Sequence, residues 1–295
     1  MSVTLLLRIF EKKHKTLLTI SLLLLIVSLG IIGFKWISRG EIVQKGVTLQ
    51  GGLTITIPVT SAVNLQALGN HLDETFPDVE INVRGISEGG SLSSIIIESS
   101  DNIEEKLIED VREYGIVVQE DGYTAEFIGS SLGQSFFRQT IIAIAIAFLL
   151  MGLAVFITFR KLVPSLFVML AAFSDIMSTL AVVSLLDIRL STAGIAAFLM
   201  LIGYSVDTDI LLTTRVIRSK EGTVFDRVKG ALRTGLIMST TSLAAVLVAY
   251  FFTQSDVIKQ IMLILAIGLA FDVIYTWFQN ASILRLSLEK KTEHE

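Results

Sequence analysis

The chain has 295 residues, of which 52% are hydrophobic and 18% charged, and its mean hydropathy is +0.69. This composition is too apolar for a soluble globular protein of this size, so we expect a membrane protein. Three prolines and 21 glycines exclude a low-complexity chain, and the absence of cysteine excludes disulfides, thiolate chemistry and Cys-ligated metals.

Six stretches are apolar enough to cross a bilayer, whose hydrocarbon core of about 30 Å requires roughly 20 helical residues. They are residues 16–34, 141–159, 162–186, 190–212, 234–253 and 261–284. The first has a longer apolar run than a signal peptide and no small-residue cleavage site before Lys35, so we expect a retained anchor. The sequence therefore predicts a helical membrane protein in four parts: residues 1–36 (cytosolic N-terminus and first span), 37–138 (extracytoplasmic domain), 139–284 (five further spans) and 285–295 (cytosolic tail).

The net charge of −4 is distributed unevenly along the chain. Between Glu41 and Glu126 there are 16 acidic and 4 basic residues, a net charge of −12, so the remainder carries +8. The two short loops on one side of the predicted membrane hold only Arg189 and Lys259, whereas the loops and termini on the other side are rich in Lys and Arg. Because basic loops stay in the cytosol, we predict a multi-pass protein of the cell membrane with both termini cytoplasmic. The acidic segment is then extracytoplasmic.

The acidic segment alternates strand and helix patterns. Strands are predicted at residues 47–59, 80–86, 92–98 and 123–128, and helices at 61–75 and 101–114. Ser61 and Asp101 are the expected N-caps, and a turn is expected through Glu88-Gly89-Gly90. The order is βαββαβ, which predicts a ferredoxin-like α+β domain. This fold hosts many functions, so it does not by itself indicate an activity.

Two features of this domain have simple structural interpretations. Gly51-Gly52 could begin a phosphate loop, but neither GxxxxGK[ST] nor GxGxxG follows, so we expect a turn or a close packing contact. His71 is the domain's one histidine and stands beside Asp73 and Glu74, so we expect it on a solvated face rather than at a metal.

Four carboxylates lie inside the apolar stretches, and these are the candidate functional residues: Asp175, Asp207, Asp209 and Asp272. An ionised carboxylate in hydrocarbon costs several kcal/mol unless it is paired, hydrated or protonated. Asp207 and Asp209 are about 200° apart around a helix, so they cannot share a face. Asp207 instead forms a stripe with three residues on its own helix, Met200, Gly203 and Tyr204.

The fifth stretch opens with Arg233 and Thr234 and carries hydroxyl residues at Ser239, Thr240, Thr241 and Ser242. A short cytosolic loop joins it to the fourth stretch, so we hypothesise that Asp207 faces Arg233 and these hydroxyls across a hydrated interior. A structural ion pair that only fixes helix register is the alternative.

The other three carboxylates are open to two interpretations each. Asp209 lies nearer the cytosol and either joins the site or reaches interfacial water. Asp175, flanked by Ser174 and Ser178, and Asp272, followed by polar residues, either line the same pathway or make packing hydrogen bonds. The polar residues after Asp272 are Tyr275, Trp277, Gln279 and Asn280.

The fourth stretch resembles the fourth-span signature of the SecF family, membrane proteins that accompany the Sec preprotein translocase. The similarity lies in the run Leu201-Ile202-Gly203-Tyr204-Ser205-Val206-Asp207-Thr208-Asp209-Ile210, which is followed by Arg215-Val216. Three further matches are Gly46 with Gln50-Gly51-Gly52, Ser174-Asp175, and Arg233-Thr234 with Ser239-Thr240-Thr241. The layout of one span, an external βαββαβ domain and five spans also resembles the family, so the resemblance covers nearly the whole chain.

The chain departs from the bacterial pattern at one position. Bacterial members usually read Asn-Asp where this chain reads Asp207-Thr208, so the carboxylate falls one residue earlier, as it does in the companion protein SecD. This shift and the short termini resemble archaeal members of the SecD/SecF family.

The resemblance implies a complex with SecD beside a SecY-type channel, in which the proton gradient assists the export of unfolded preproteins. The membrane part would share its architecture with resistance-nodulation-division transporters. Asp207 would be the proton-coupling aspartate, with Asp209 as the competing candidate, and Arg233 would take the place of the family's span-five arginine. Beyond these partners and membrane lipids, we expect no enzymatic activity, cofactor, metal or nucleic acid.

Three other functions fit parts of the sequence. An intramembrane aspartyl protease needs two carboxylates that share a proton, but its Tyr-Asp and Gly-x-Gly-Asp signatures are absent. A small-molecule exporter of the resistance-nodulation-division type usually has a larger, duplicated external domain. A structural scaffold of the translocase without a proton role is the strongest alternative.

Overall fold

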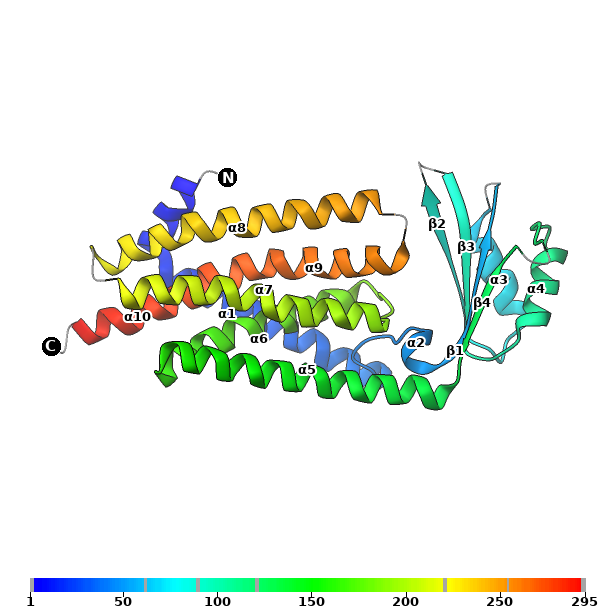
Figure 1. The fold of residues 1–295 in the computed structure, drawn as a ribbon, viewed down its shortest axis with the longest axis horizontal. Helices are drawn as coiled ribbons and strands as arrows, with labels where there is room; N and C mark the ends of the chain where they lie inside the picture. Colours follow the sequence, from blue (N-terminus) through cyan, green and yellow to red (C-terminus); the bar gives the residue numbers. More distant parts are fainter. Residues whose placement is uncertain are drawn as a thin grey trace.

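The molecule consists of a bundle of long helices with a small α+β domain at one end of it (Figure 1). The computed structural model describes residues 3–60, 63–88, 91–119, 122–219, 222–253 and 255–292. Both chain termini lie at the end of the bundle that is opposite the domain (Figure 1). The N- and C-termini therefore share one side of the bundle, as the sequence predicts.

The described residues contain six helices that are long and apolar enough to span a membrane, which confirms the predicted number. The spans are α1 (Val3–Arg39), α5 (Ser130–Phe159), α6 (Leu162–Leu185), α7 (Thr192–Arg218), α8 (Val224–Phe252), and the last helix α9 (Asp256–Ile274), which continues through η1 (Tyr275–Asn280) into α10 (Ala281–Thr292). Several helices extend beyond the apolar stretches. Hydropathy marks the part of a helix that faces hydrocarbon, whereas the helix itself ends where its backbone is capped.

The last span contains a six-residue π-helix, η1 (Tyr275–Asn280), which the sequence did not predict. A π-turn widens the helix locally and often marks a functional position. Four polar side chains of this segment, together with Trp277, are almost completely buried in the bundle: Tyr275, Thr276, Gln279 and Asn280. The last span therefore presents polar groups to the interior.

The domain is ferredoxin-like, as predicted. It consists of β1 (Gly52–Pro58), α3 (Leu65–Thr75), β2 (Ile81–Glu88), β3 (Ser91–Ser99), α4 (Glu104–Glu113) and β4 (Thr124–Ile128). The strands form an antiparallel sheet in the order β2-β3-β1-β4. Both helices cover the sheet face that points away from the bundle (Figure 1). Alternate residues of β1 (Leu53, Ile55 and Ile57) are fully buried against that layer, as expected for a strand of a sheet with one covered face.

Four local predictions for the domain need correction or fall outside the described chain. Residues 47–50 form a helical turn, α2 (Val47–Gln50), instead of the start of a strand, because Gly51 at φ +89° redirects the chain. The N-cap of α3 is Asn64, whose side chain accepts the Ala67 N–H at 3.1 Å; the predicted cap Ser61 and the turn residues 89–90 lie outside the described residues. Asp101 does not cap α4, which begins three residues later.

The segment between α1 and the domain also pairs with the loop between α6 and α7. Gly46 N–H donates to Leu190 O and Leu190 N–H donates to Gln44 O, both at 2.8 Å, which forms a parallel bridge. Arg189 in the same loop forms an ion pair with Glu80 of the domain at 2.9 Å. The α6–α7 loop therefore fixes the segment that leads into the domain by hydrogen bonds and contacts the residue before β2 by an ion pair.

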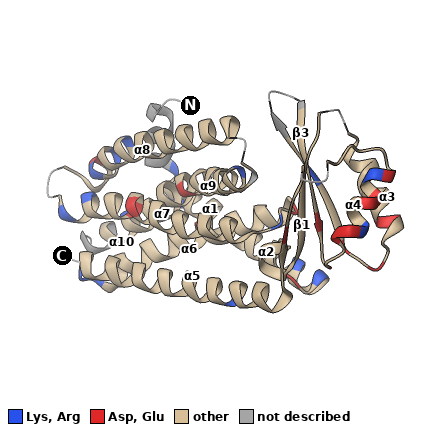
Figure 2. Cartoon of the chain, turned by 45° about the vertical axis from the view of Figure 1, so that its right-hand side comes forward, with Lys and Arg blue, Asp and Glu red and all other residues tan. Residues whose placement is uncertain are grey.

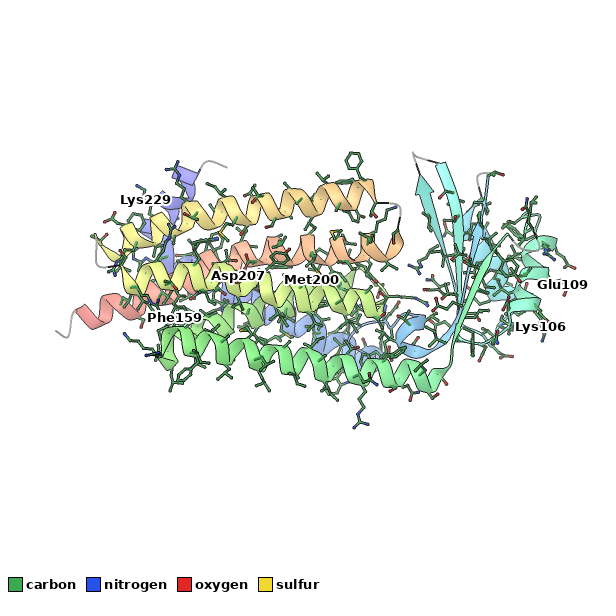
Figure 3. All side chains as sticks on the ribbon, in the orientation of Figure 1. Lys106, Glu109, Phe159, Met200, Asp207 and Lys229 are labelled. Carbon is green, nitrogen blue, oxygen red and sulfur yellow. The ribbon has the colours of Figure 1, made fainter. Side chains whose placement is uncertain are left out.

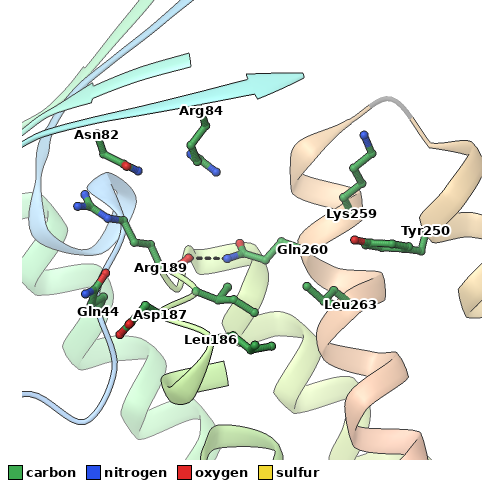
Figure 4. Close-up of a pocket in the computed structure, with 11 residues that line it drawn as sticks. Gln44, Asn82, Arg84, Leu186, Asp187, Arg189, Tyr250, Lys259, Gln260 and Leu263 are labelled. Atoms are coloured by element: carbon green, nitrogen blue, oxygen red, sulfur yellow. Dashed lines mark hydrogen bonds between the residues drawn. The ribbon is translucent and has the colours of Figure 1, made fainter. Parts of the chain in front are cut away.

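A pocket of about 450 Å³ separates the sheet from the ends of the helices (Figure 4). Arg84 of β2, Arg189 and Lys259 of α9 line it, together with Tyr250 at the end of α8. Gln260 donates to the carbonyl of Arg189 inside this pocket (Figure 4). Polar and apolar side chains line this pocket together, and three of them are the cations Arg84, Arg189 and Lys259.

Asp187 in the α6–α7 loop forms ion pairs with two cations of α1. Its carboxylate accepts hydrogen bonds from Lys35 at 2.8 Å and Arg39 at 2.7 Å, and these hold the pKa of Asp187 below its usual value of 3.8. Since the folded pKa is the lower one, the stabilisation is present above the unfolded pKa and disappears as the pH falls through the folded pKa.

We therefore expect Asp187→Asn to unfold at a lower temperature than the wild type at pH 7 and at the same temperature in acid below the folded pKa. Asn tolerates the left-handed backbone that Asp187 adopts (φ +48°), so the substitution removes only the charge. Thermal unfolding in detergent at both pH values measures the effect. A difference that persists in acid would show that the ion pairs are not its cause.

Candidate functional site

Three carboxylates from three different helices lie buried in the interior of the bundle. Asp175 of α6 and Asp209 of α7 have no exposed surface, and Asp272 of α9 is 1% exposed. Asp175 and Asp272 lie near the middle of their spans, and Asp209 lies four residues beyond Ser205, the middle residue of α7. The structure thus brings together three of the four candidate aspartates.

Hydroxyl and amide groups surround these carboxylates. Ser205 donates a very short hydrogen bond to Asp175 Oδ2, and Asn280 Nδ2 donates to Asp209 Oδ1 at 2.8 Å. Asp272 lies within reach of the Thr208 hydroxyl at 3.1 Å and the Thr276 hydroxyl at 3.2 Å. All four donors are almost completely buried, so the cluster is shielded from water within the chain.

A second chain of hydroxyls lies beside Asp175. Ser178, one turn further along α6, is hydrogen-bonded to Tyr275 OH at 2.6 Å and to Ser28 of α1 at 2.9 Å. The Ser28 hydroxyl in turn donates to the Leu24 carbonyl at 2.9 Å. These hydrogen bonds therefore connect α6 and η1 to the first span.

The ion pairs of the described residues involve none of the three buried carboxylates, so no cation among these residues pairs with them. One oxygen of Asp175 (Oδ1) and one of Asp209 (Oδ2) are buried without a hydrogen-bond partner. Asp209 does not reach interfacial water, so that interpretation is wrong. Asp175 and Asp272 both make packing hydrogen bonds, as one of their two interpretations proposed.

Asp207 lies on the opposite face of α7 and is exposed on the surface of the subunit. Met200, Gly203 and Tyr204 are exposed on the same stripe, with Met200 at 44% and Tyr204 at 41%. Asp207 and Met200 both lie along the central part of α7 (Figure 3). The predicted opposition of Asp207 and Asp209 is confirmed, but the prediction that Asp207 faces the interior is wrong. The spacing of these residues shows that they share one face of the helix, but it does not show whether that face is buried or exposed.

The predicted pairing of Asp207 with Arg233 is also wrong for the single chain. Arg233 is exposed, and among the described residues it forms no ion pair. Of the hydroxyl residues on α8, Thr240 and Thr241 are exposed and Thr234 is partly exposed. Ser239 alone among these four is buried, and it lies beside Asp272. The hydroxyls of α8 thus divide between the subunit surface and the interior cluster.

Sequence reasoning missed four hydroxyl groups of the interior cluster as site residues. Ser28, Thr208, Thr276 and Ser178 are ordinary hydroxyl residues in apolar helices, where they often bond to the preceding turn. A usable signal was present on two helices: Ser178 stands three residues after Asp175, and Thr276 stands four after Asp272, so each shares a helix face with its carboxylate.

The fold and the intramembrane carboxylates define a multi-pass membrane protein with one ferredoxin-like domain and a polar centre within its spans. Residues 111–290 match the family model for "Protein export membrane protein SecD/SecF, C-terminal". A protein-export membrane protein SecF from Methanolacinia petrolearia is 35% identical over 94% of this chain and 94% of its own length. Its counterpart from Methanocaldococcus jannaschii is 36% identical over 93% of this chain and 95% of its own.

A solved structure shows the same fold. The crystal structure of SecDF, a translocon-associated membrane protein from Thermus thermophilus, superposes with a TM-score of 0.77 at 19% identity and covers 95% of this chain. This chain spans 38% of the length of that longer protein. The family match and the relatives together establish that the chain belongs to the SecD/SecF family of protein-export membrane proteins, among relatives named SecF.

Proposed function

We propose that this chain is the SecF subunit of a complex with SecD, which lies beside a SecY-type channel and promotes the export of unfolded preproteins across the cell membrane. The relatives are named for protein export, and the solved relative is described as translocon-associated. That relative is a longer chain named SecDF, which supports a second, SecD-like part as the partner. Membrane lipids would cover the remaining surface, and no role for nucleic acid, metal or cofactor is proposed.

The exposure of Asp207 on the subunit surface supports two parts of this proposal, the partner subunit and the use of the proton gradient. A carboxylate on the outer surface of a span faces lipid or another protein, and an ionised group in lipid is costly. Asp207 has no ion-pair partner among the described residues, which supports a partner subunit that covers it. We propose that Asp207 lies at the interface with SecD and takes up and releases protons there. Moving one charge across 100 mV yields about 2.3 kcal/mol, which is enough to shift a two-state equilibrium.

The other candidate residues have supporting roles in this proposal. Arg233, exposed on α8, would supply the cation near Asp207 once the partner is bound, together with Thr234, Thr240 and Thr241. Gly203 and Tyr204 would provide the close contact surface on α7. Asp175, Asp209 and Asp272, with Ser205 and Ser239, would belong to the interior part of the proton path.

The proposed orientation places both termini in the cytoplasm and the ferredoxin-like domain outside. Lys and Arg gather at the end of the bundle that carries the termini, and Asp and Glu gather on α3 and α4 (Figure 2). This distribution follows the preference of basic loops for the cytosolic side. The domain would then meet the exported chain as it leaves the channel.

Two substitutions test the function in cells. We expect Asp207→Asn and Arg233→Met each to slow preprotein export by about tenfold, a loss of roughly 1.4 kcal/mol, while the complex still assembles. Secretion of a reporter preprotein measures export, and co-purification with SecD measures assembly. Lys229→Met is the matched control, because Lys229 is exposed on the same helix one turn before Arg233. Wild-type export in both variants would leave the structural scaffold as the function.

A further inference from the structure

The pocket between the sheet and the helix ends has a surplus of positive charge. Arg84, Arg189 and Lys259 line it, and the one carboxylate among its lining residues, Asp187, already forms ion pairs with two cations of α1. The other polar lining groups are amides and a phenol, all of which can donate hydrogen bonds: Gln44, Asn82, Gln260 and Tyr250. The pocket is therefore suited to an anion, although it lies beneath an acidic domain.

The two arginines keep donors available for such an anion. Val83 packs into the core of the domain, so alternation along β2 directs Arg84 from the opposite face of the sheet. Nη2 of Arg84 contacts Glu98 at 2.7 Å. Nη2 of Arg189 contacts Glu80 at 2.9 Å. A guanidinium carries five N–H donors, so each arginine can bind a second anion without losing its carboxylate.

The cations belong to different parts of the fold. Lys259 lies in the first turn of α9, and none of the ion pairs within the described ranges includes it. Figure 4 shows Arg84 on the sheet, Arg189 on the α6–α7 loop and Lys259 on α9 around the same space. An anion bound there would contact both the domain and the bundle.

The side of the pocket that faces the spans is apolar. Leu186, directly after α6, and Leu263 of α9 line the pocket on that side, whereas Asn82 and Arg84 line it on the side of the sheet (Figure 4). Leu186 is 59% exposed. The lining thus changes from cationic to apolar toward the spans, which is the order of groups in a lipid with an anionic headgroup. A free phosphate ion would use the cationic side alone.

Aromatic residues place the pocket at the level of the membrane surface. Tyr250 lines the pocket at the end of α8 and packs edge-on against Phe251, with 5.3 Å between the ring centroids. Phe251 and Phe252 are 74% and 82% exposed. Tyr and Trp side chains collect where lipid headgroups meet the hydrocarbon, and Trp36 of α1 is exposed next to Lys35, which binds Asp187 of the pocket. Lipid phosphates lie at this level.

We propose that this pocket binds the headgroup of an anionic phospholipid. Arg84, Arg189 and Lys259 bind the phosphate, and the lipid chains pass along Leu186 and Leu263 into the hydrocarbon. Basic pockets among membrane spans bind lipid headgroups in this way, and arginine matches the geometry of phosphate oxygens. The bound lipid connects β2 to α9 and so restrains the domain against the bundle. The proposal goes beyond the export function and requires only that the bundle spans a membrane.

Native mass spectrometry of the purified full-length chain in a neutral detergent, titrated with phosphatidylglycerol, tests this site. We expect one retained lipid per chain, with binding about tenfold weaker in Lys259→Gln and in Arg189→Gln, since each loses one charge-assisted contact. Arg138→Gln is the matched control and should bind as the wild type does. Arg138 is exposed on α5, does not line the pocket, and takes part in no ion pair of the described residues.

Three further probes define the ligand on the wild-type chain. Phosphatidylcholine with the same chains should bind more weakly than phosphatidylglycerol, because its headgroup has no net charge. Glycerol phosphate, which lacks chains, and a short polyglutamate peptide should each fail to displace the bound lipid at an equal concentration.

Four results would overturn the proposal. Equal binding of the two lipids would exclude recognition of charge, and an equal loss in Arg138→Gln would indicate general attraction to the surface. Displacement by glycerol phosphate would indicate a site for a free anion, and displacement by polyglutamate a site for an acidic protein segment. If the variants fail to fold, the three probes on the wild-type chain still decide the question. No readout involves export, so failure here leaves the proposed function intact.

Discussion

Gly51→Ala is expected to destabilise the fold by about 3 kcal/mol or more, through combined backbone strain and overlap. Gly51 adopts φ +89°, where an L side chain is strained, and a Cβ there would lie 2.4 Å from Ser130 Cα and 2.6 Å from Ser130 N. Both neighbours are backbone atoms at the start of α5, so no side-chain rotation relieves the overlap. The two ends of the domain meet at this point, and the contact explains the glycine motif.

Thermal unfolding of the purified chain measures this loss, with Gly129→Ala as the matched control. Gly129 directly precedes α5, has φ −62°, and would present a Cβ to open space. The control should unfold within about 0.5 kcal/mol of the wild type, as surface substitutions usually do. Equal stability of Gly51→Ala and Gly129→Ala would contradict the packing described here.

Gly235→Val is expected to cost about 2–3 kcal/mol by overpacking the contact between α8 and the π-helix. A Cβ at Gly235 would lie 2.2 Å from Cζ2 of Trp277, whose side chain is 1% exposed and therefore cannot move aside. Gly230→Ala, on the same helix with nothing within 4 Å of its Cβ, should cause no loss.

A double substitution separates packing from other effects. If the tryptophan ring causes the loss, Trp277→Phe should restore part of the stability of Gly235→Val, so that the combined cost is smaller than the sum of the two single costs. Additive costs in thermal unfolding would mean that the ring is not responsible.

The sequence predicted the spans and the domain because both depend on local patterns. Apolar length marks each span, and alternate burial of Leu53, Ile55 and Ile57 marks a strand of a half-covered sheet. Helix ends were less predictable, since Ser130 begins α5 well before the apolar stretch. The π-helix was not predicted, because no local pattern of residues 275–280 marks it; the structure buries its Tyr275 and Trp277 inside the bundle.

The candidate site was predictable in its members but not in its arrangement. The four aspartates are conspicuous in apolar stretches, and helical geometry correctly separated Asp207 from Asp209. The direction of each face depends on which helices surround α7, which its own sequence does not contain. Asp207 was therefore expected inside and lies on the surface, whereas Asp209 lies in the interior with Asp175 and Asp272.

We propose that a proton gradient acts through Asp207 to promote export. The direct measurement is preprotein translocation into protease-protected form in membrane vesicles that contain this chain, SecD and the channel, with and without an imposed proton gradient. We expect the gradient to accelerate translocation with the wild-type chain and to have no effect with Asp207→Asn. An equal acceleration with both chains, or none with the wild type, would contradict it.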